Sequence, residues 1–168
     1  MVQVAQNRVV LLLYLRYGVY DSRYPATFYR SAPAITEDRE TPPLLPLRPI
    51  SSCQTKDCLT IILTAEIGHG ATGVVHRGTL HVESFDESVP LDAVVKLAFD
   101  SEQRDALKNE HEIYRLLRLN GVVQGIATVL GFFDDVEGGP SALVMLYAGV
   151  SLETEPEQVL SLSERCVL

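Results

Sequence analysis

The sequence predicts an α+β fold, in which a five-stranded antiparallel sheet carries one helix and follows an irregular, proline-rich arm. Three observations predict this fold. Six of the nine prolines lie between Pro25 and Pro49, and proline fixes φ and removes a backbone donor. From residue 59 onward, runs rich in β-branched residues alternate with glycine-containing and acidic turns, as strands do. After Phe99 the apolar spacing changes from a period of two to one of about 3.6, the period of a helix.

The 168 residues are enough for one domain with an appended arm. We expect an irregular linker arm over residues 1–58 and a folded body over residues 59–152. Residues 153–168 are expected to begin a further acidic helix or linker. The longest apolar run, Val9–Leu15, has seven residues, whereas a membrane-spanning helix needs about 20. We therefore expect no membrane partner.

The charge limits the classes of partner that we expect, and the cysteine content indicates the compartment. The net charge is −8, and residues 59–168 contain seven Lys/Arg against seventeen Asp/Glu. Binding to nucleic-acid phosphates needs clustered cations, so no nucleic-acid partner is expected. The three cysteines have no metal-ligand spacing and are interpreted as reduced thiols. We therefore expect an intracellular protein, located in the cytoplasm.

The elements of the body follow one another with clear boundaries. The expected strands are Leu59–Ile67, Gly73–Val82, Leu91–Phe99, Thr128–Phe133 and Ala142–Tyr147. The helix is expected to start after Asp100 or Ser101, either of which can cap its first turn. It runs to about Leu119, where Asn120 and Gly121 supply a left-handed stop.

A glycine-rich turn joins the first two expected strands. Residues 68–75 match a GxGxxG pattern at Gly68, Gly70 and Gly73. The residues after Gly73 have a strand pattern, which disfavours a dinucleotide-binding fold, because there the third glycine opens a helix. No Gly-Lys-Ser/Thr occurs, so a Walker-type loop is excluded. What remains is a hairpin whose amides can approach phosphate oxygens, or a plain glycine-rich turn.

Two charges of opposite sign interrupt apolar surfaces on neighbouring elements. Lys96 lies inside an apolar strand, where an unpaired ammonium is costly to bury. The helix stripe expected to face the sheet consists of Ala106, Glu110, Ile113 and Leu117. We therefore expect Lys96 and Glu110 to form an ion pair; the alternative is that both merely reach the edge of the core. Glu112 is expected on the helix surface, paired with Lys108 or Arg115.

With these residues in place, about ninety residues from Leu59 to Leu152 resemble the small N-terminal lobe of a protein kinase. The matching positions are Gly68, Gly70, Gly73 and Val75 in the glycine loop, Lys96 at the end of Ala-Val-Val-Lys, and Glu110 in the helix. Residues 143–148 resemble the fifth strand and the hinge. The residues around Gly125 and Gly149 are similar to those of divergent, fungal-type kinase-like sequences.

The resemblance implies an ATP site. Its residues are Ile67, Gly68, Gly70, Gly73, Val75, Val94, Lys96, Glu110, Met145, Leu146 and Ala148. Lys96 would hold the α- and β-phosphates, Glu110 would position Lys96, and Met145 would be the gatekeeper. Magnesium is expected to accompany ATP, although its protein ligands are missing from this chain. Two residues depart from the family pattern: Val94 replaces a smaller alanine, and Thr72 replaces an aromatic residue at the tip of the loop.

The family's catalytic residues have no match in this sequence. It contains no His-x-Asp-x-x-x-x-Asn loop, no Asp-Phe-Gly and no Ala-Pro-Glu. Histidines 69, 76, 81 and 111 are expected at strand and helix surfaces. Apart from the Lys96–Glu110 pair, we identify no catalytic and no metal-binding residue, and we expect this chain alone to be inactive in phosphoryl transfer.

We therefore expect a protein-kinase-like ATP-binding domain, truncated after the hinge. In the complete family such a domain transfers phosphate from ATP to protein Ser/Thr. One alternative is a non-catalytic, pseudokinase-type interaction module, whose exposed lobe face would bind a protein partner or a second copy of the chain. Another is a small-molecule phosphotransferase with the same lobe.

Overall fold

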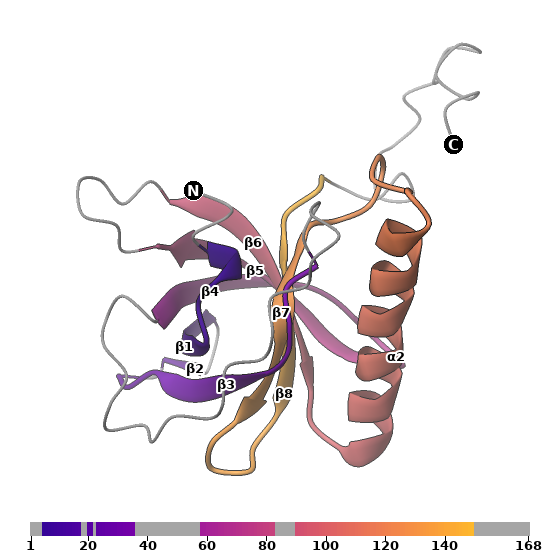
Figure 1. Cartoon of the computed structure of the whole chain (residues 1–168). Helices are drawn as coiled ribbons and strands as arrows, with labels where there is room; N and C mark the ends of the chain where they lie inside the picture. Colours follow the sequence, from indigo (N-terminus) through magenta and orange to yellow (C-terminus); the bar gives the residue numbers. More distant parts are fainter. Residues whose placement is uncertain (1–4, 18–19, 22, 36–57, 83–89, 150–168) are drawn as a thin grey trace, which may run out of the picture.

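The computed structural model describes residues 5–17, 20–21, 23–35, 58–82 and 90–149. It shows a sheet that closes into a barrel, with one long helix packed on its outer face (Figure 1). The strands are β1 (Val10–Tyr17), β2 (Tyr20–Asp21), β3 (Ala26–Ala32), β4 (Cys58–Gly70), β5 (Gly73–His81), β6 (Leu91–Ala98), β7 (Val129–Asp135) and β8 (Ser141–Leu146). The helix is α2 (Ser101–Leu119).

Seven of the strands form a closed, mixed barrel. Around the barrel the order is β1-β3-β7-β8-β6-β5-β4, and β4 returns to β1. The closing contact is parallel and runs in register from Val10 opposite Cys58 to Leu15 opposite Leu63. Every other pairing between neighbouring strands is antiparallel, and β2 extends only the hairpin with β1.

The fold class predicted from the sequence is therefore wrong. Residues 10–17 and 26–32 do not belong to an irregular arm, because β1 and β3 close the sheet and share its core with the residues after 58. The density of prolines misled the prediction. Pro25 immediately precedes β3 and Pro33 immediately follows it, so these two prolines delimit a strand without interrupting it. The apolar run that begins at Val9 is mostly β1.

The five strands expected after residue 58 are present, close to their expected bounds. They pair antiparallel in the order β4-β5-β6-β8-β7. They do not form an open five-stranded sheet, because β1 and β3 cover both of its edges. The expected stretch 153–168 lies outside the described residues, as do two of the three cysteines. The described cysteine, Cys58, is partly exposed.

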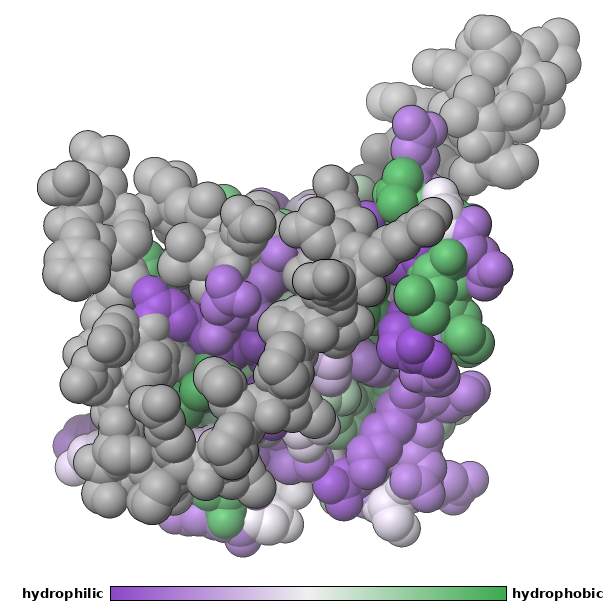
Figure 2. Space-filling model, in the orientation of Figure 1, coloured by the Kyte–Doolittle hydropathy of each residue, from purple (hydrophilic) through white to green (hydrophobic). Residues whose placement is uncertain are grey.

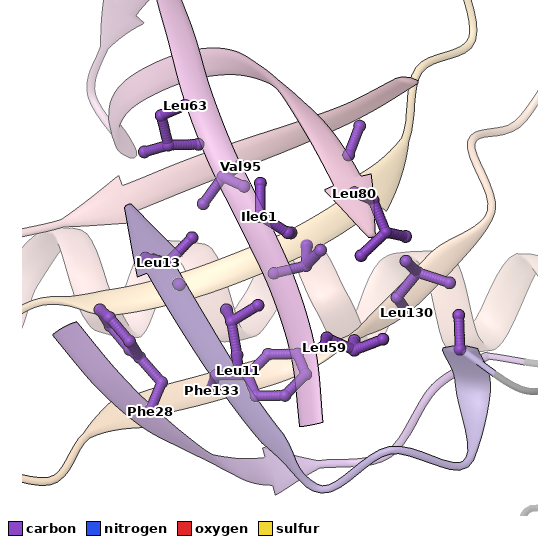
Figure 3. Close-up of a cluster of buried hydrophobic side chains, with 14 of the residues drawn as sticks. Leu11, Leu13, Phe28, Leu59, Ile61, Leu63, Leu80, Val95, Leu130 and Phe133 are labelled. Carbon is purple, nitrogen blue, oxygen red and sulfur yellow. The ribbon is translucent and has the colours of Figure 1, made fainter. Parts of the chain in front are cut away.

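The barrel interior holds the larger hydrophobic cluster (Figure 3). Successive strand side chains alternate between the two faces of a sheet. In β6, Ala93, Val95 and Leu97 therefore point into the barrel, while Val94 and Lys96 point outward. The largest buried side chains of the interior include Leu11 from β1 and Phe28 from β3. The N-terminal strands thus supply a part of the core that residues 59–152 lack.

Polar groups occupy parts of the interior beyond the apolar cluster. Arg30 of β3 lies over the ring of Phe133, with 5.4 Å between the guanidinium carbon and the ring centre. Its side chain donates hydrogen bonds to the carbonyls of Gln6 (2.6 Å) and Ala5 (3.3 Å). Burial lowers the pKa of Arg30 to about 10. His76 of β5 is also buried, and burial lowers its pKa despite the opposing effect of Glu66.

Helix α2 covers the outer face of the sheet over β6, β7 and β8 (Figure 1). As expected, Asp100 caps its first turn and accepts a hydrogen bond from the amide of Gln103 at 2.8 Å. At its end, Gly121 adopts a φ of +80°, which suits the left-handed stop. Within the described part of the chain, no helix combines the length and the apolar character needed to cross a membrane.

The face of α2 that packs on the sheet differs by about one residue from the expected stripe. Leu107 and His111 are its buried residues, and Tyr114 packs against the same cluster. Ile113, expected to face the sheet, is 49% exposed. The expectation that all histidines lie at the surface is wrong for His111 and His76. The apolar pattern misplaced the stripe because His111, a polar residue, occupies a position on the buried face.

Candidate functional site

The centre of the candidate site is an ion pair between β6 and α2. The Nζ atom of Lys96 lies 2.5 Å from Oε1 of Glu110 and donates a hydrogen bond to it. The two side chains are 22% and 20% exposed, so the pair lies at the margin of the core. The sequence prediction that these residues form an ion pair is confirmed. An ammonium at such a margin retains donors for a second anion, because Lys carries three.

The register of the sheet places the glycine hairpin next to this pair. Lys96 lies opposite Val75 of β5, and Val75 lies opposite Gly68 of β4. Cross-strand partners share a face of the sheet. Gly68, Val75 and Lys96 therefore form one row on the helix-covered side, and the end of the hairpin lies beyond this row, at Gly70 opposite Gly73.

The fold requires glycine at only one of the three positions of the pattern. Gly73 has a φ of +116°, and a Cβ there would lie 2.0 Å from the carbonyl oxygen of Leu97. The fold alone requires this glycine. At Gly68 and Gly70 a Cβ would have no atom within 4 Å, and neither residue has a positive φ. The fold does not require glycine at these two positions, which leaves an open surface where backbone can approach a ligand closely.

An apolar surface adjoins the row on the side away from the hairpin tip. Val94 lies opposite Met145, and both belong to the cluster under α2. Met145 is buried and Val94 is partly buried. Ile67 is half exposed and lies at a bulge of β4, between Glu66 and Gly68. Because Met145 is buried, Val94 and Ile67 are the parts of this surface that a flat apolar group such as a nucleobase could contact.

The two expected hinge residues lie at the end of β8. The side chain of Leu146 packs on the interior cluster, and its amide donates to the carbonyl of Thr128 at 2.9 Å. That amide is therefore engaged within the protein. Ala148 is exposed. Of the expected site residues, the structure thus brings Gly68, Val75, Val94, Lys96, Glu110 and Met145 to one side of the sheet, with Leu146 directed to the other.

Glu112, the other carboxylate in this part of α2, has a different environment from Glu110. Glu112 accepts two hydrogen bonds from Arg115, at 2.7 and 2.5 Å. These bonds hold the pKa of the Glu112 carboxyl below its ordinary value. The expected pairing of Glu112 on the helix surface is confirmed for Arg115, and Glu110 remains the carboxylate that faces Lys96.

Sequence reasoning missed a second polar contact beneath α2. His111 is 5% exposed. Its Nε2 atom lies 2.9 Å from the carbonyl oxygen of Pro33. A carbonyl only accepts, so Nε2 carries the proton. Burial lowers the pKa of His111, and the hydrogen bond to Pro33 only partly opposes this effect. Nothing local in the sequence indicates the contact, because 78 positions separate the two residues.

Sequence reasoning also missed a cluster on the outer rim of the apolar surface. Arg77, the cross-strand neighbour of Val94, reaches across β6. Its guanidinium carbon lies 4.3 Å from the ring centre of Tyr147, and one of its nitrogens lies 2.7 Å from Asp92. This cluster marks where the apolar surface ends, on the side away from Lys96. Its signal in the sequence is weak, since exposed arginines and aspartates are common.

No metal site accompanies these residues within the described ranges. There, no three His, Cys, Asp or Glu side chains lie close enough together to hold an ion. Asp134 of β7 is a partly buried acid, and its side chain is 27% exposed. Burial raises its pKa, but hydrogen bonds from Ser141, Ser31 and Arg104 outweigh this effect and lower it. Asp134 thus serves as an internal acceptor that ties β7 to β8 and α2.

The chain was compared with family models, with curated proteins and with solved structures. None of the three comparisons found a match.

Proposed function

We propose that the helix-covered face of the barrel binds ATP, with Lys96 as the principal phosphate ligand. The observation that carries this proposal is the Lys96–Glu110 ion pair, which lies in one row with an open glycine hairpin. The resemblance of residues 59–152 to a protein kinase implies the same residues for the same role. Closure of the barrel does not oppose it, because β1 and β3 join the sheet at its edges.

The chemistry of the row suits a polyphosphate. Lys96 supplies a cation, and the hairpin supplies backbone amides at glycines without Cβ atoms. Amides and an ammonium together neutralise phosphate oxygens, as in other glycine-rich phosphate loops. Glu110 holds the ammonium in place and leaves its remaining donors available. Val75 and Val94 would contact the base from the same face.

The proposal covers binding, and phosphoryl transfer is not part of it. Transfer requires a base that orients the attacking hydroxyl and carboxylates that hold magnesium. The sequence contains no match to the family motifs that provide them. Magnesium would arrive with ATP, held by its phosphates. In a radiolabel assay with a protein substrate, we expect no transfer above the level of Lys96→Met; clear transfer above it would contradict this restriction.

Calorimetric titration with ATP tests the binding. Lys96→Met removes the cation while keeping a long apolar chain, and we expect it to weaken ATP binding at least about tenfold, which corresponds to about 1.4 kcal/mol. Lys108→Met is the matched control. It removes an exposed lysine of α2 whose Nζ atom lies over the ring of Phe132, 6.0 Å from the ring centre. Equal affinities for the wild type and Lys96→Met would contradict the proposal.

An exposed apolar surface favours a second candidate function, a non-catalytic interaction module. Ile113, Leu116, Leu119, Val122 and Val123 are all substantially exposed. They lie on the distal half of α2 and just after it, where apolar side chains gather in Figure 2. Contiguous exposed apolar surfaces often bind proteins. Sedimentation of the wild type and of Leu116→Asp tests self-association: a larger species that only the wild type forms would support this function.

A further inference from the structure

We propose that the segment Pro33–Ile35, which we call the anchoring segment, positions Glu110 for its ion pair with Lys96. The segment follows β3 directly and belongs to none of the elements expected to form the site. His111 is the residue of α2 through which it acts. The role in the ion pair stands on the contacts below, while its consequence for ATP rests on the proposed function.

The anchoring segment is fixed to the sheet on one side. The amide of Ile35 donates to the carbonyl of Val129 in β7, at 3.1 Å. The Ile35 side chain is buried in the cluster under α2, together with Leu107 of the helix and Phe132 of β7. Ala34 is also buried. The segment therefore has a defined position relative to the barrel even without its hydrogen bond to His111.

The segment is tied to the helix on the other side. His111 Nε2 donates to the carbonyl oxygen of Pro33 at 2.9 Å. His111 is buried, and leaving its Nε2 donor unpaired there would be costly. The charged groups near His111 are Glu112, which favours its protonation, and Arg115, which opposes it. The hydrogen bond thus fixes one point of α2 against the barrel.

His111, where this hydrogen bond holds α2, is adjacent to Glu110. Residues 110 and 111 are consecutive in a helix, so the position of one backbone determines that of the other. The Lys96–Glu110 contact is 2.5 Å long, and a shift of α2 by one or two ångströms would break it. The next described polar tie between α2 and the sheet is Arg104–Asp134, at 2.8 Å and about two turns away; the contacts of Leu107 and Tyr114 with the cluster are apolar and less directional. The His111 bond is therefore the one suited to set the position of Glu110.

The test measures the strength of the ion pair without any nucleotide. Denaturant unfolding of the wild type, Lys96→Met, Glu110→Gln and the double variant gives the coupling between the two charges. For the wild type we expect a coupling of about fivefold in the unfolding equilibrium constant. In the His111→Phe background, which keeps a ring but removes the donor, we expect the coupling to fall close to onefold.

Measuring the same coupling in three further variants distinguishes a role of the anchoring segment in positioning Glu110 from a general effect on packing. His111→Gln keeps an N–H donor at a similar distance, and we expect it to restore most of the coupling. Ile35→Ala loosens the anchoring segment itself and should reduce the coupling as His111→Phe does. Glu112→Gln changes the neighbouring exposed pair and should leave the coupling intact. Unchanged coupling in His111→Phe, or equal loss in Glu112→Gln, would overturn the proposal.

ATP titration of the same variants adds the functional consequence. We expect His111→Phe to weaken ATP binding at least about threefold in the wild-type background and to have no further effect in Glu110→Gln. If the wild type binds no ATP, the proposed function fails while the coupling measurement still decides on the anchoring segment. If ATP binds and the coupling does not depend on His111, the anchoring role fails alone.

Discussion

The two faces of the sheet are packed with different chemistry. Inside the barrel, the buried cluster consists of hydrophobic side chains from all seven barrel strands, with Arg30 and His76 as polar additions. On the outer face, a smaller cluster under α2 is bordered by the Lys96–Glu110 pair and the His111–Pro33 contact. We therefore attribute most of the stability of the barrel to its interior, and the ligand proposed above would use the charges of the outer face. The predictions below test this division.

The largest effect is expected for a cavity in the interior. Leu11 of β1 is fully buried, so Leu11→Ala should lower the free energy of unfolding by about 2–5 kcal/mol. Leu12→Ala, at the adjacent and only partly buried position, is the control and should cost clearly less. Denaturant unfolding gives both values. Equal, small losses would mean that β1 does not contribute to the barrel core.

A smaller effect is expected for the ion pair of the outer face. Lys96→Met leaves the Glu110 carboxylate partly buried without its cation, which should lower the free energy of unfolding by about 1–2 kcal/mol. In Lys96→Met/Glu110→Leu both charges are gone, and stability should return toward that of the wild type. A double variant that is less stable than Lys96→Met would contradict this account.

Acid is expected to lower the free energy of unfolding, because each face of the sheet buries a histidine. Burial lowers the pKa of His76 and of His111 below the ordinary 6.5. The unfolded chain therefore binds protons before the folded chain does, and the free energy of unfolding should fall as the pH drops below about 6.5. Unfolding measured between about pH 7 and 5 checks this. His76→Gln and His111→Gln should each remove part of the slope; a slope unchanged in both would refute the assignment.

The smallest effect is expected on the solvent-exposed side of α2. Glu112→Gln removes a carboxylate that pairs only with Arg115 among the described residues. Exposed pairs contribute little, because water and salt screen them. We expect no measurable change in stability or in ATP affinity. A loss comparable to that of Glu110→Gln would show that the two carboxylates are not distinguished as the structure indicates.

The sequence predicted the elements after residue 58 well, because their signals are local. Alternating β-branched runs, the cap at Asp100 and the stop at Gly121 each depend on a few neighbouring residues. The pairing of Lys96 with Glu110 was also predictable, since each charge interrupts an apolar pattern on an adjacent element.

Barrel closure was not predictable in the same way. β1 reaches β4 in parallel across more than forty residues, and no local pattern encodes such a contact. The prolines of the first fifty residues suggested an arm because their average density hid two strands that contain no proline. His111 was misjudged for a related reason: its acceptor, the carbonyl of Pro33, belongs to the region taken as irregular.

The central claim is that ATP binds the outer face, and amide NMR spectra recorded during an ATP titration test it most directly. We expect shift changes at residues 68–75 and at Lys96, with much smaller changes at interior positions such as Leu11 and Ile61. In Lys96→Met these changes should require at least about tenfold more ATP. No change up to millimolar ATP, or changes confined to the barrel interior, would contradict the claim.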